Sequence, residues 1–521
     1  MSAGPLCDRV RAMCVDVEGV FGPGPARDEV VAIRDRLAER TPRIAVGGKL
    51  KAGKSTLVNA LLGQRLAATN GTETTMVVAW FRDHYQSRIL VRPRDGAPYY
   101  LPAGPGGRIP ADLRRMDDRT TAPPDREGDQ EVAAELARRV ASVTVEVPNK
   151  RLAERHIIVD TPGLGSLTGL DDSSLAALAD ADALLYLMPH PSLQDRQVLT
   201  ELRAAAGAAR LSAATVLGVL SQIDLLGERP DDVWPGARRV AARSAGQLRG
   251  LLADVIPVVG LLAETAFGDE FTEADTRRLL RLADSDRAAA RRALYKAESF
   301  LTWDGGPLDE AERQRLLDML GVYGLTHLLA AIDSGARGTR ALLDTMEELS
   351  GIRPVLDHVD RHFVAGADRL RAQTALGRLE LAMSHGAAPS ADGRQVLDRV
   401  REELAQLRRH PLLLQIEAAA ALAALAGAAG TAAGGRLAAD ETAADELLAL
   451  ATGSDLAAMV GCPPAAAGAE VAGAEVAGAA EAALDRWRTR ESSPTRALER
   501  RVIRAAIDLC QAIYTQATAP A

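Results

Sequence analysis

Residues 43–63 read RIAVGGKLKAGKSTLVNALLG, and this stretch decides the fold. A short apolar run precedes a glycine-rich turn, and a second apolar segment with helical spacing follows it. Within it, GKLKAGKS (48–55) matches the phosphate-loop pattern G-x-x-x-x-G-K-[ST], which requires a strand before it and a helix after it. Both flanks have that character. The sequence therefore predicts an α/β sheet with a phosphate site at the end of a strand.

The chain has only five lysines, and Lys49, Lys51 and Lys54 all lie in this loop. A compact ammonium fits a nest of backbone N–H groups better than the broad guanidinium of arginine. We assign Lys54 to the β- and γ-phosphates and the Ser55 hydroxyl to Mg²⁺. For Lys49 and Lys51 the plainer interpretation is a local positive field. The rest of the predicted nucleotide-binding set in this loop is Gly48, Ala52, Gly53 and Thr56.

Further along, IIVDTPG (157–163) places Asp160 at the end of an apolar run. Its carboxylate is expected to hold Mg²⁺ through water, and the Gly163 N–H to sense the γ-phosphate.

The segment GVLSQIDLL (218–226) is the candidate for binding the nucleotide base. Its Asp224 carboxylate can accept two hydrogen bonds from a guanine edge. This segment departs from the usual [NT]-K-x-D, because Ser221 and Gln222 stand in the first two positions. An amide therefore replaces the lysine stem that normally lies along the base. A last guanine contact is expected near Val259 and Gly260.

Apolar runs alternate with helix-like segments up to residue 260, and strand signals vanish after about residue 265. The predicted fold is a phosphate-loop α/β domain with a mixed, mostly parallel sheet, followed by a long α-helical bundle. Residues 94–130 are rich in Pro, Gly and Arg and are expected to form a surface loop. The small-residue stretch 411–435 is long enough for a membrane span, but Gln415 and Glu417 interrupt it, so we favour a closely packed helix.

Charge and cysteine content narrow the function classes. The net charge is −8; residues 1–265 carry 33 charges of each sign, and residues 266–521 carry 29 Lys and Arg against 37 Asp and Glu. Neither part has the basic excess that nucleic-acid binding needs, so no nucleic-acid partner is expected.

The N-terminal residues do not resemble a signal peptide, because Asp8, Arg9 and Arg11 lie where its apolar run would be. With no CxxC among them, four free thiols fit a cytoplasmic protein: Cys7, Cys14, Cys462 and Cys510.

Four motifs together resemble the bacterial dynamin-like GTPases, and among these the actinobacterial members: AGKSTLVNALLG (52–63), TNGTETTMVVAWFRD (69–83), VDTPG (159–163) and LSQID (220–224). The resemblance covers 41–265 by motif and the helical remainder by architecture. It implies a GTPase domain at 41–265, N-terminal helices at 1–40 that join a helical neck, and a neck and stalk at 266–521.

The resemblance also implies GTP hydrolysis with Mg²⁺, coupled to dimerisation across the nucleotide and to membrane remodelling or tethering. In this family a threonine beyond the loop lysine closes over Mg²⁺ and the γ-phosphate, which matches Thr75, with Thr72 and Thr74 as neighbouring candidates. The expected partners are a second copy or a dynamin-like paralogue, through the GTPase domains, and lipid at the inner face of the cell membrane, contacted peripherally.

Two departures bear on catalysis. Leu50 and Lys51 stand where eukaryotic dynamins have Gln and Ser, and Leu164, after DTPG, has no group to orient a water. We hypothesise that Lys51 supplies the positive charge that a monovalent cation supplies elsewhere, and we expect slow basal turnover. Two alternatives stay open: a weakly catalytic regulatory subunit of a hetero-oligomer, and a ribosome- or RNA-associated GTPase. The latter predicts a compact basic appendage, whereas 266–521 is long and acidic.

Overall fold

The computed structural model describes most of the chain: residues 4–39, 41–67, 77–104, 107, 139–153, 155–162, 177–178, 180–206, 215–226, 233–248, 251–304, 306–386, 390–426, 437, 440–453, 455–462, 473–492 and 496–519.

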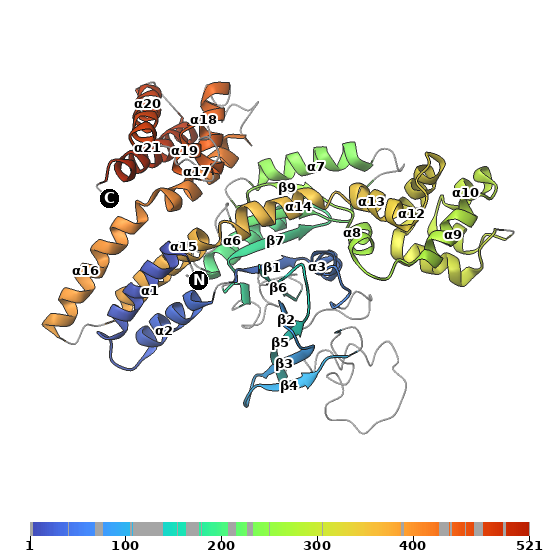
Figure 1. The fold of residues 1–521 in the computed structure, drawn as a ribbon, viewed down its shortest axis with the longest axis horizontal. Coiled ribbons are helices and arrows are strands. Elements are labelled where there is room, and N and C mark those ends of the chain that lie inside the picture. The colour runs from blue at the N-terminus through green and yellow to red at the C-terminus, as the bar shows by residue number, and fades with distance from the viewer. Residues whose placement is uncertain are drawn as a thin grey trace.

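In those ranges nine strands form one sheet, in the order β4-β3-β5-β2-β6-β1-β7-β8-β9 (Figure 1). The pairs β1–β6, β1–β7, β7–β8, β8–β9 and β2–β5 are parallel, while β2–β6, β3–β5 and β3–β4 are antiparallel. This confirms the mixed, mostly parallel sheet that the sequence predicts. The strands are β1 (Arg43–Gly48), β2 (Val78–Asp83), β3 (Arg88–Pro93), β4 (Tyr99–Pro102), β5 (Val140–Val147), β6 (Ile157–Asp160), β7 (Ala183–Met188), β8 (Val216–Leu220) and β9 (Val255–Pro257).

Helices cover both faces at the centre of this sheet, which is why β7 is buried at every position. On one face the core includes α3 (Lys54–Leu62), α8 (Gly260–Phe267), α14 (Arg353–His358) and the π-helix η6 (Val359–Val364). On the other face it includes α6 (Leu193–Ala206) and α7 (Val233–Gln247). Strand β1 thus leads into the phosphate loop at the centre of the sheet, between the two layers of helices.

The sequence prediction for 94–130 is wrong at its start, because β4 lies inside it. Tyr99 pairs with Val91 and Leu101 with Ile89, so β4 is the edge partner of β3. The stretch reads as a loop because of its Pro and Gly residues, but a short edge strand tolerates Pro at its end. Residues 108–130 lie outside the described part of the chain.

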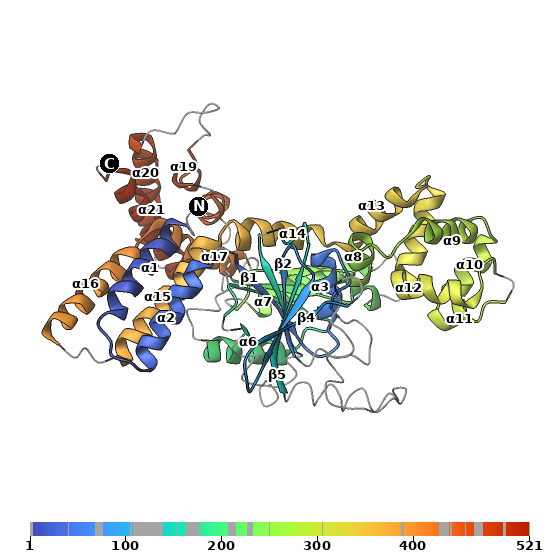
Figure 2. The ribbon, with the colours of Figure 1, turned by 60° about the horizontal axis from the view of Figure 1, so that its bottom comes forward.

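The helices beyond the sheet form three packing units (Figures 1 and 2). A helical lobe at one end of the sheet continues the core of the α6–α7 face; it consists of α9 (Glu273–Ala283), α10 (Arg287–Ala293), α11 (Ala297–Leu301), α12 (Glu310–Asp333) and α13 (Thr339–Ser350). At the opposite end a bundle with its own core contains α1 (Pro5–Glu18), α2 (Pro25–Ala38), α15 (Ala367–His385) and α16 (Ala391–Arg408). The third unit contains α17 (Pro411–Ala426), α18 (Glu441–Thr452), α19 (Leu456–Met459), α20 (Gly473–Glu491) and α21 (Ala497–Ala517).

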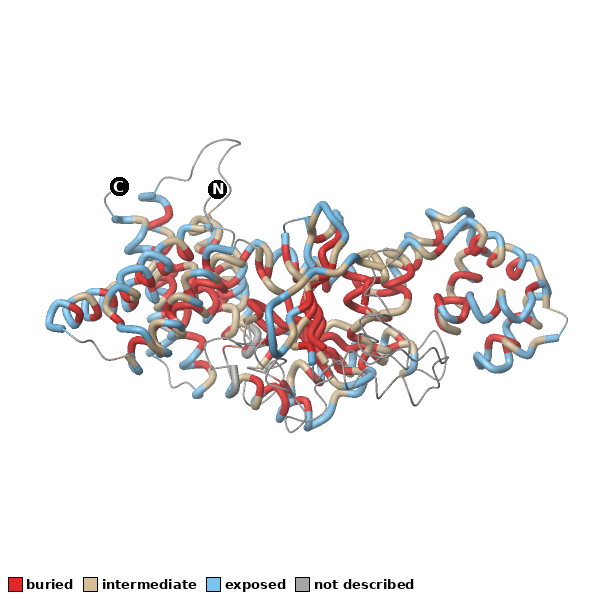
Figure 3. Tube along the Cα trace, turned by 90° about the horizontal axis from the view of Figure 1, so that it is seen from below, coloured by how far each residue is buried: buried red, intermediate tan, exposed pale blue. Residues whose placement is uncertain are grey.

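Buried residues follow the sheet and the inner faces of these units (Figure 3).

The helices of 266–521 do not lie together in one bundle, because the sheet lies between α9–α13 and α15–α21 (Figure 1). The domain boundaries at 40 and 265 stay predictions.

One described helix, α12, is long and apolar enough to span a membrane by length and composition, and 56% of its apolar window is buried in the protein. It carries the buried Arg313, which donates to the carbonyls of Leu301 and Leu308. Helix α17, in the stretch singled out above, is shorter. Its Gln415 is buried and donates to the Gly453 carbonyl at 2.8 Å, which indicates packing against neighbouring helices.

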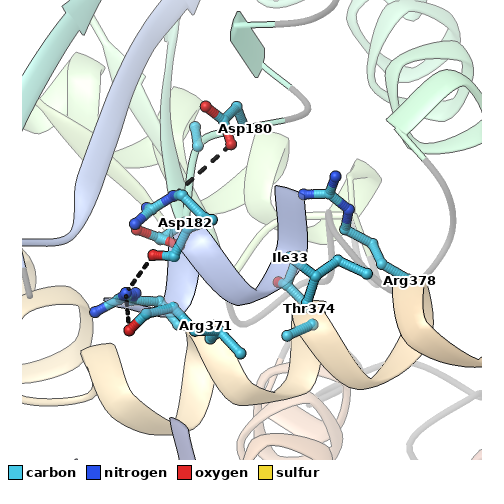
Figure 4. A pocket seen from close by; sticks show the side chains of 10 residues that line it. Ile33, Asp180, Asp182, Arg371, Thr374 and Arg378 are labelled. Carbon is cyan, nitrogen blue, oxygen red and sulfur yellow. Dashed lines mark hydrogen bonds and ion pairs between the residues drawn. The ribbon is translucent and has the colours of Figure 1, made fainter. Parts of the chain in front are cut away.

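A cluster of charged residues, which includes Arg36, Asp182 and Arg371, connects the α1–α2–α15–α16 bundle to the sheet (Figure 4). Asp182, just before β7, accepts hydrogen bonds from the Arg36 guanidinium on α2 and from the Arg43 N–H at 2.8 Å. Arg371 on α15 is buried and donates to the carbonyl of Arg36 at 2.8 Å, where α2 ends. The orphan carbonyls at the C-terminus of α2 are thereby capped by a cation from the neighbouring helix.

Candidate functional site

The phosphate loop begins where β1 pairs with β7 and ends as α3 begins. Gly48 has φ +145°, and a Cβ there would lie 2.5 Å from the Leu187 carbonyl oxygen, so only glycine fits. Gly53, with φ +86°, is the N-cap of α3. The helix N-terminus and the left-handed turn together point N–H groups into the loop, as an anion site requires.

Lys54 is buried at the centre of this loop, with 7% of its surface exposed. Its Nζ donates to the Lys49 carbonyl at 3.1 Å and lies 3.4 Å from the Gly48 carbonyl. Burial lowers the pKa of Lys54, and the nearby Asp160 carboxylate partly offsets this shift. An anionic ligand in the loop would favour the charged ammonium further.

Ser55 and Asp160 meet beside Lys54. The Ser55 hydroxyl donates to Asp160 Oδ2 at 3.1 Å, although the two residues belong to α3 and to the end of β6. Among the described residues no three His, Cys, Asp or Glu side chains gather as around a metal ion. One hydroxyl and one carboxylate nevertheless fit Mg²⁺, which takes its other ligands from phosphate and water.

The segment predicted to bind guanine, residues 221–224, is hydrogen-bonded to the phosphate loop. Ser221 Oγ donates to the Ala52 carbonyl at 2.8 Å, and Gln222 Nε2 donates to the Lys51 carbonyl at 2.9 Å. Gln222 therefore has a defined position despite replacing a lysine, and its φ of +55° turns the chain toward Asp224. Asp224 is half-buried, and burial raises the pKa of its carboxyl group.

The last predicted contact, at Val259 and Gly260, is held by the helical lobe. The Val259 N–H donates to the Ser350 carbonyl at 2.9 Å, at the end of α13, and Gly260 begins α8. In the same corner Trp234 Nε1 donates to the Tyr323 hydroxyl at 2.9 Å. Sequence reasoning missed Trp234, Tyr323 and Ser350, and no local pattern marks them, because their partners are distant in the chain.

The two further loop lysines differ. The Lys51 side chain is exposed, and its backbone has the left-handed φ of +60°. Lys49 forms an ion pair with Asp195 on α6, a partner that the sequence does not reveal. Thr56 is half-buried in the first turn of α3. Thr75 and Gly163, with Thr72, Thr74 and Leu164, lie outside the described residues.

A phosphate loop after a parallel strand, a carboxylate at the end of the adjoining strand and an aspartate loop tied to the phosphate loop define the class of P-loop GTPases. The model of the dynamin family matches residues 44–223. Isoniazid-induced protein IniC of Mycobacterium tuberculosis is 32% identical over 385 residues, which cover 71% of this chain and 73% of that relative. The chain belongs to the dynamin family and is a GTPase.

A second relative, isoniazid-induced protein IniA of Mycobacterium tuberculosis, is 30% identical over 156 residues, which cover 30% of this chain and 22% of IniA. A solved structure of an oligomerised bacterial dynamin pair, described as sensing and tethering membranes, is 14% identical. It covers 86% of this chain and 79% of its own at a TM-score of 0.32, which is too low to carry a structural argument. The resemblance read from the motifs is confirmed by the family match and by IniC.

Proposed function

We propose that this GTPase binds GTP with Mg²⁺ and couples nucleotide-dependent association to work on a membrane surface. The observation that carries the proposal is the buried Lys54 beside the Ser55–Asp160 pair, at the mouth of a loop whose glycines bring backbone N–H groups together. Lys54 would contact the β- and γ-phosphates, and Ser55 and Asp160, the latter through water, would hold Mg²⁺. When bound, Mg²⁺ neutralises charge that develops on the phosphates.

The base is recognised at the other end of the loop. Asp224 accepts hydrogen bonds from the guanine edge, and the Gln222 amide lies along the base while it stays bonded to the phosphate loop. Ser221 shapes this corner through its side-chain bond to the Ala52 carbonyl, and Val259 and Gly260 shape it through their backbone positions. Adenine offers no matching pair of donors to a carboxylate, which favours GTP over ATP.

Hydrolysis depends on three further residues in this proposal. Lys51 supplies positive charge in cis, since its side chain is exposed at the mouth of the loop. Thr75 would close over Mg²⁺ and the γ-phosphate, and the Gly163 N–H would contact the γ-phosphate; both residues lie outside the described part of the chain. Because Leu164, directly after DTPG, has no group that could orient the attacking water, we expect basal turnover to be slow.

Exposed leucines around the nucleotide loop support association face to face. Leu50, Leu193 and Leu225 are 51%, 84% and 69% exposed. They lie on three segments that hydrogen bonds hold together, because Lys49 bonds Ser192 and Gln222 bonds the Lys51 carbonyl. A second copy, or a dynamin-like paralogue, would bury these side chains over the nucleotide.

Leu193→Ser is expected to abolish GTP-dependent dimerisation in light scattering and to leave the GTP affinity of the monomer unchanged. Leu381→Ser on α15, at a leucine that is 58% exposed, is the matched control and should dimerise normally. Dimerisation of Leu193→Ser at the wild-type concentration would refute this interface.

The proposed membrane contact is peripheral, at the inner face of the cell membrane. More than half of the apolar window of α12 is buried, and α17 packs against neighbouring helices. We therefore assign neither helix as a membrane span. Flotation of the full chain with anionic liposomes tests the contact, and release by high salt would support it. A chain that stays at the bottom of the gradient with and without GTP would contradict it.

Calorimetry tests the nucleotide site itself. Wild-type protein should bind GTP more tightly than ATP, and only with Mg²⁺ present. Lys54→Ala should lose binding, whereas Lys150→Ala, at an exposed lysine outside the loop, should keep it. Mg²⁺-independent binding, or equal affinity for both nucleotides, would overturn the assignment of the metal or of the base.

A further inference from the structure

The side chain of Lys49 joins the phosphate loop to α6. Its Nζ lies 3.2 Å from both carboxylate oxygens of Asp195 and donates to Ser192 Oγ at 2.9 Å. Asp195 lies in the first turn of α6 and has no exposed surface, while the Lys49 side chain is 26% exposed. The phosphate loop and α6 are thus joined by an ion pair whose acidic partner is fully buried.

Capping of α6 alone does not require Lys49. Asp195 already accepts hydrogen bonds from the Ser192 N–H at 2.7 Å, from the Ser192 hydroxyl at 3.1 Å and from the buried Tyr186 hydroxyl at 3.1 Å. A half-buried cation adds charge compensation for a carboxylate that water does not reach. The cation comes from the phosphate loop, so the position of the loop and the stability of this carboxylate depend on each other.

The backbone of Lys49 holds the centre of the nucleotide site. Its carbonyl accepts from Lys54 Nζ at 3.1 Å and from the Ala52 N–H at 3.2 Å. The next two residues form the exposed turn of the loop, with Leu50 half exposed and Lys51 at a left-handed φ of +60°. Lys49 is therefore the last anchored residue before the loop turns, and its carbonyl sets where the Lys54 ammonium lies.

We propose that the Lys49–Asp195 ion pair is a positioning pair for the phosphate loop, which holds the Lys49 carbonyl and hence Lys54 in place for the β-phosphate of the nucleotide. This inference rests on the proposed function, since the ligand is the nucleotide of the same site. Lys49 and Asp195 act through Lys54 and do not contact the reacting atoms. Their effect therefore falls on the affinity for both GTP and GDP, which share the β-phosphate, and not on kcat.

The test is calorimetry with Mg²⁺ and GTP or GDP on four full-length variants: Lys49→Met, Lys49→Arg, Asp195→Asn and the double variant K49M/D195N. Lys49→Met and Asp195→Asn should each raise the Kd for both nucleotides about tenfold, in the range of coupling between contacting residues. The double variant should be no weaker than either single one, because each single change already breaks the pair. Lys49→Arg keeps the charge and should restore most of the affinity, and kcat at saturating GTP should change less than about twofold.

Asp195→Asn keeps the size of the side chain and one acceptor oxygen, which can still accept from the Ser192 N–H and hydroxyl. Its amide nitrogen replaces the oxygen that accepts from the Tyr186 hydroxyl, and that hydroxyl can instead accept from the amide. The variant therefore removes the charge and retains the cap of α6. Binding stoichiometry counts the folded molecules in each preparation. Unchanged Kd values in folded Lys49→Met, losses that multiply in the double variant, or a fall in kcat alone would each overturn the proposal. Wild-type protein that binds no GTP would instead refute the proposed function, so the two failures are distinguishable.

Discussion

Replacing Gly48 by alanine tests how closely the start of the phosphate loop packs against strand β7. Gly48 pairs with Leu187 of β7, and a Cβ would lie 2.5 Å from the Leu187 carbonyl oxygen and 3.1 Å from its Cβ. Both atoms belong to the sheet core and cannot swing away. Overpacking of this kind costs about 1–3 kcal/mol. The positive φ adds about 1–2 kcal/mol, so the expected loss is about 2–5 kcal/mol.

Gly53→Ala is the matched control, because Gly53 also has a positive φ, of +86°, but a Cβ there meets no atom within 4 Å. It should lose only the backbone contribution of about 1–2 kcal/mol. The difference between the two variants isolates the collision with β7.

Amide hydrogen exchange of the β7 amides, without nucleotide, measures the opening free energy of the sheet itself. A global unfolding curve is less suitable, since the chain has several separate cores and two-state behaviour is not expected. Equal losses in the two variants would refute the reasoning, and so would a loss below about 0.5 kcal/mol in Gly48→Ala, the size of an ordinary surface change.

Three further predictions follow from single contacts. Gln222→Lys should tighten GTP binding up to about tenfold, since an ammonium can bond the Lys51 carbonyl and lie along the base; weaker binding in calorimetry would contradict this. Tyr323→Phe leaves the Trp234 N–H without its acceptor and should lower the opening free energy of α7 by about 1–3 kcal/mol; unchanged hydrogen exchange of the α7 amides would count against it. Burial lowers the pKa of His156 to about 4 from an ordinary 6.5, so stability that is complete above pH 6.5 is lost as pH falls toward 4, by about 3 kcal/mol. In hydrogen exchange of the amides of β6, which follows His156 directly, His156→Gln should remove that part of the acid sensitivity between pH 7 and pH 4.5, after correction for the intrinsic exchange rate at each pH.

The candidate site was predictable from sequence wherever neighbouring residues make it. Gly48, Gly53, Lys54 and Ser55 lie on one turn between a strand and a helix, so their spacing alone places the N–H groups and the ammonium. Asp160 was predictable because parallel strands end at the same edge of a sheet, and β6 is the neighbour of β1. For Gln222 the motif indicated a lost lysine, and only the structure shows its amide bonded to the Lys51 carbonyl.

The helical part was predictable in content and not in arrangement. Periodicity indicates helices after residue 265, but it does not say against which surface each apolar face packs. In the structure α9–α13 extend the core on one face of the sheet, and α15–α21 lie at the other end. Strand β4 was missed for a similar reason, because an edge strand depends on the partner that pairs with it.

By itself the sequence determined the phosphate loop, the mixed α/β sheet and the family, because these depend on short motifs and on local hydrophobic spacing. Only the tertiary structure decided that Lys49 meets Asp195, 146 residues away, and that Trp234 meets Tyr323, 89 residues away. Such contacts depend on how helices and strands pack and on the direction of each side chain, and neither is encoded in the spacing of residues along one segment.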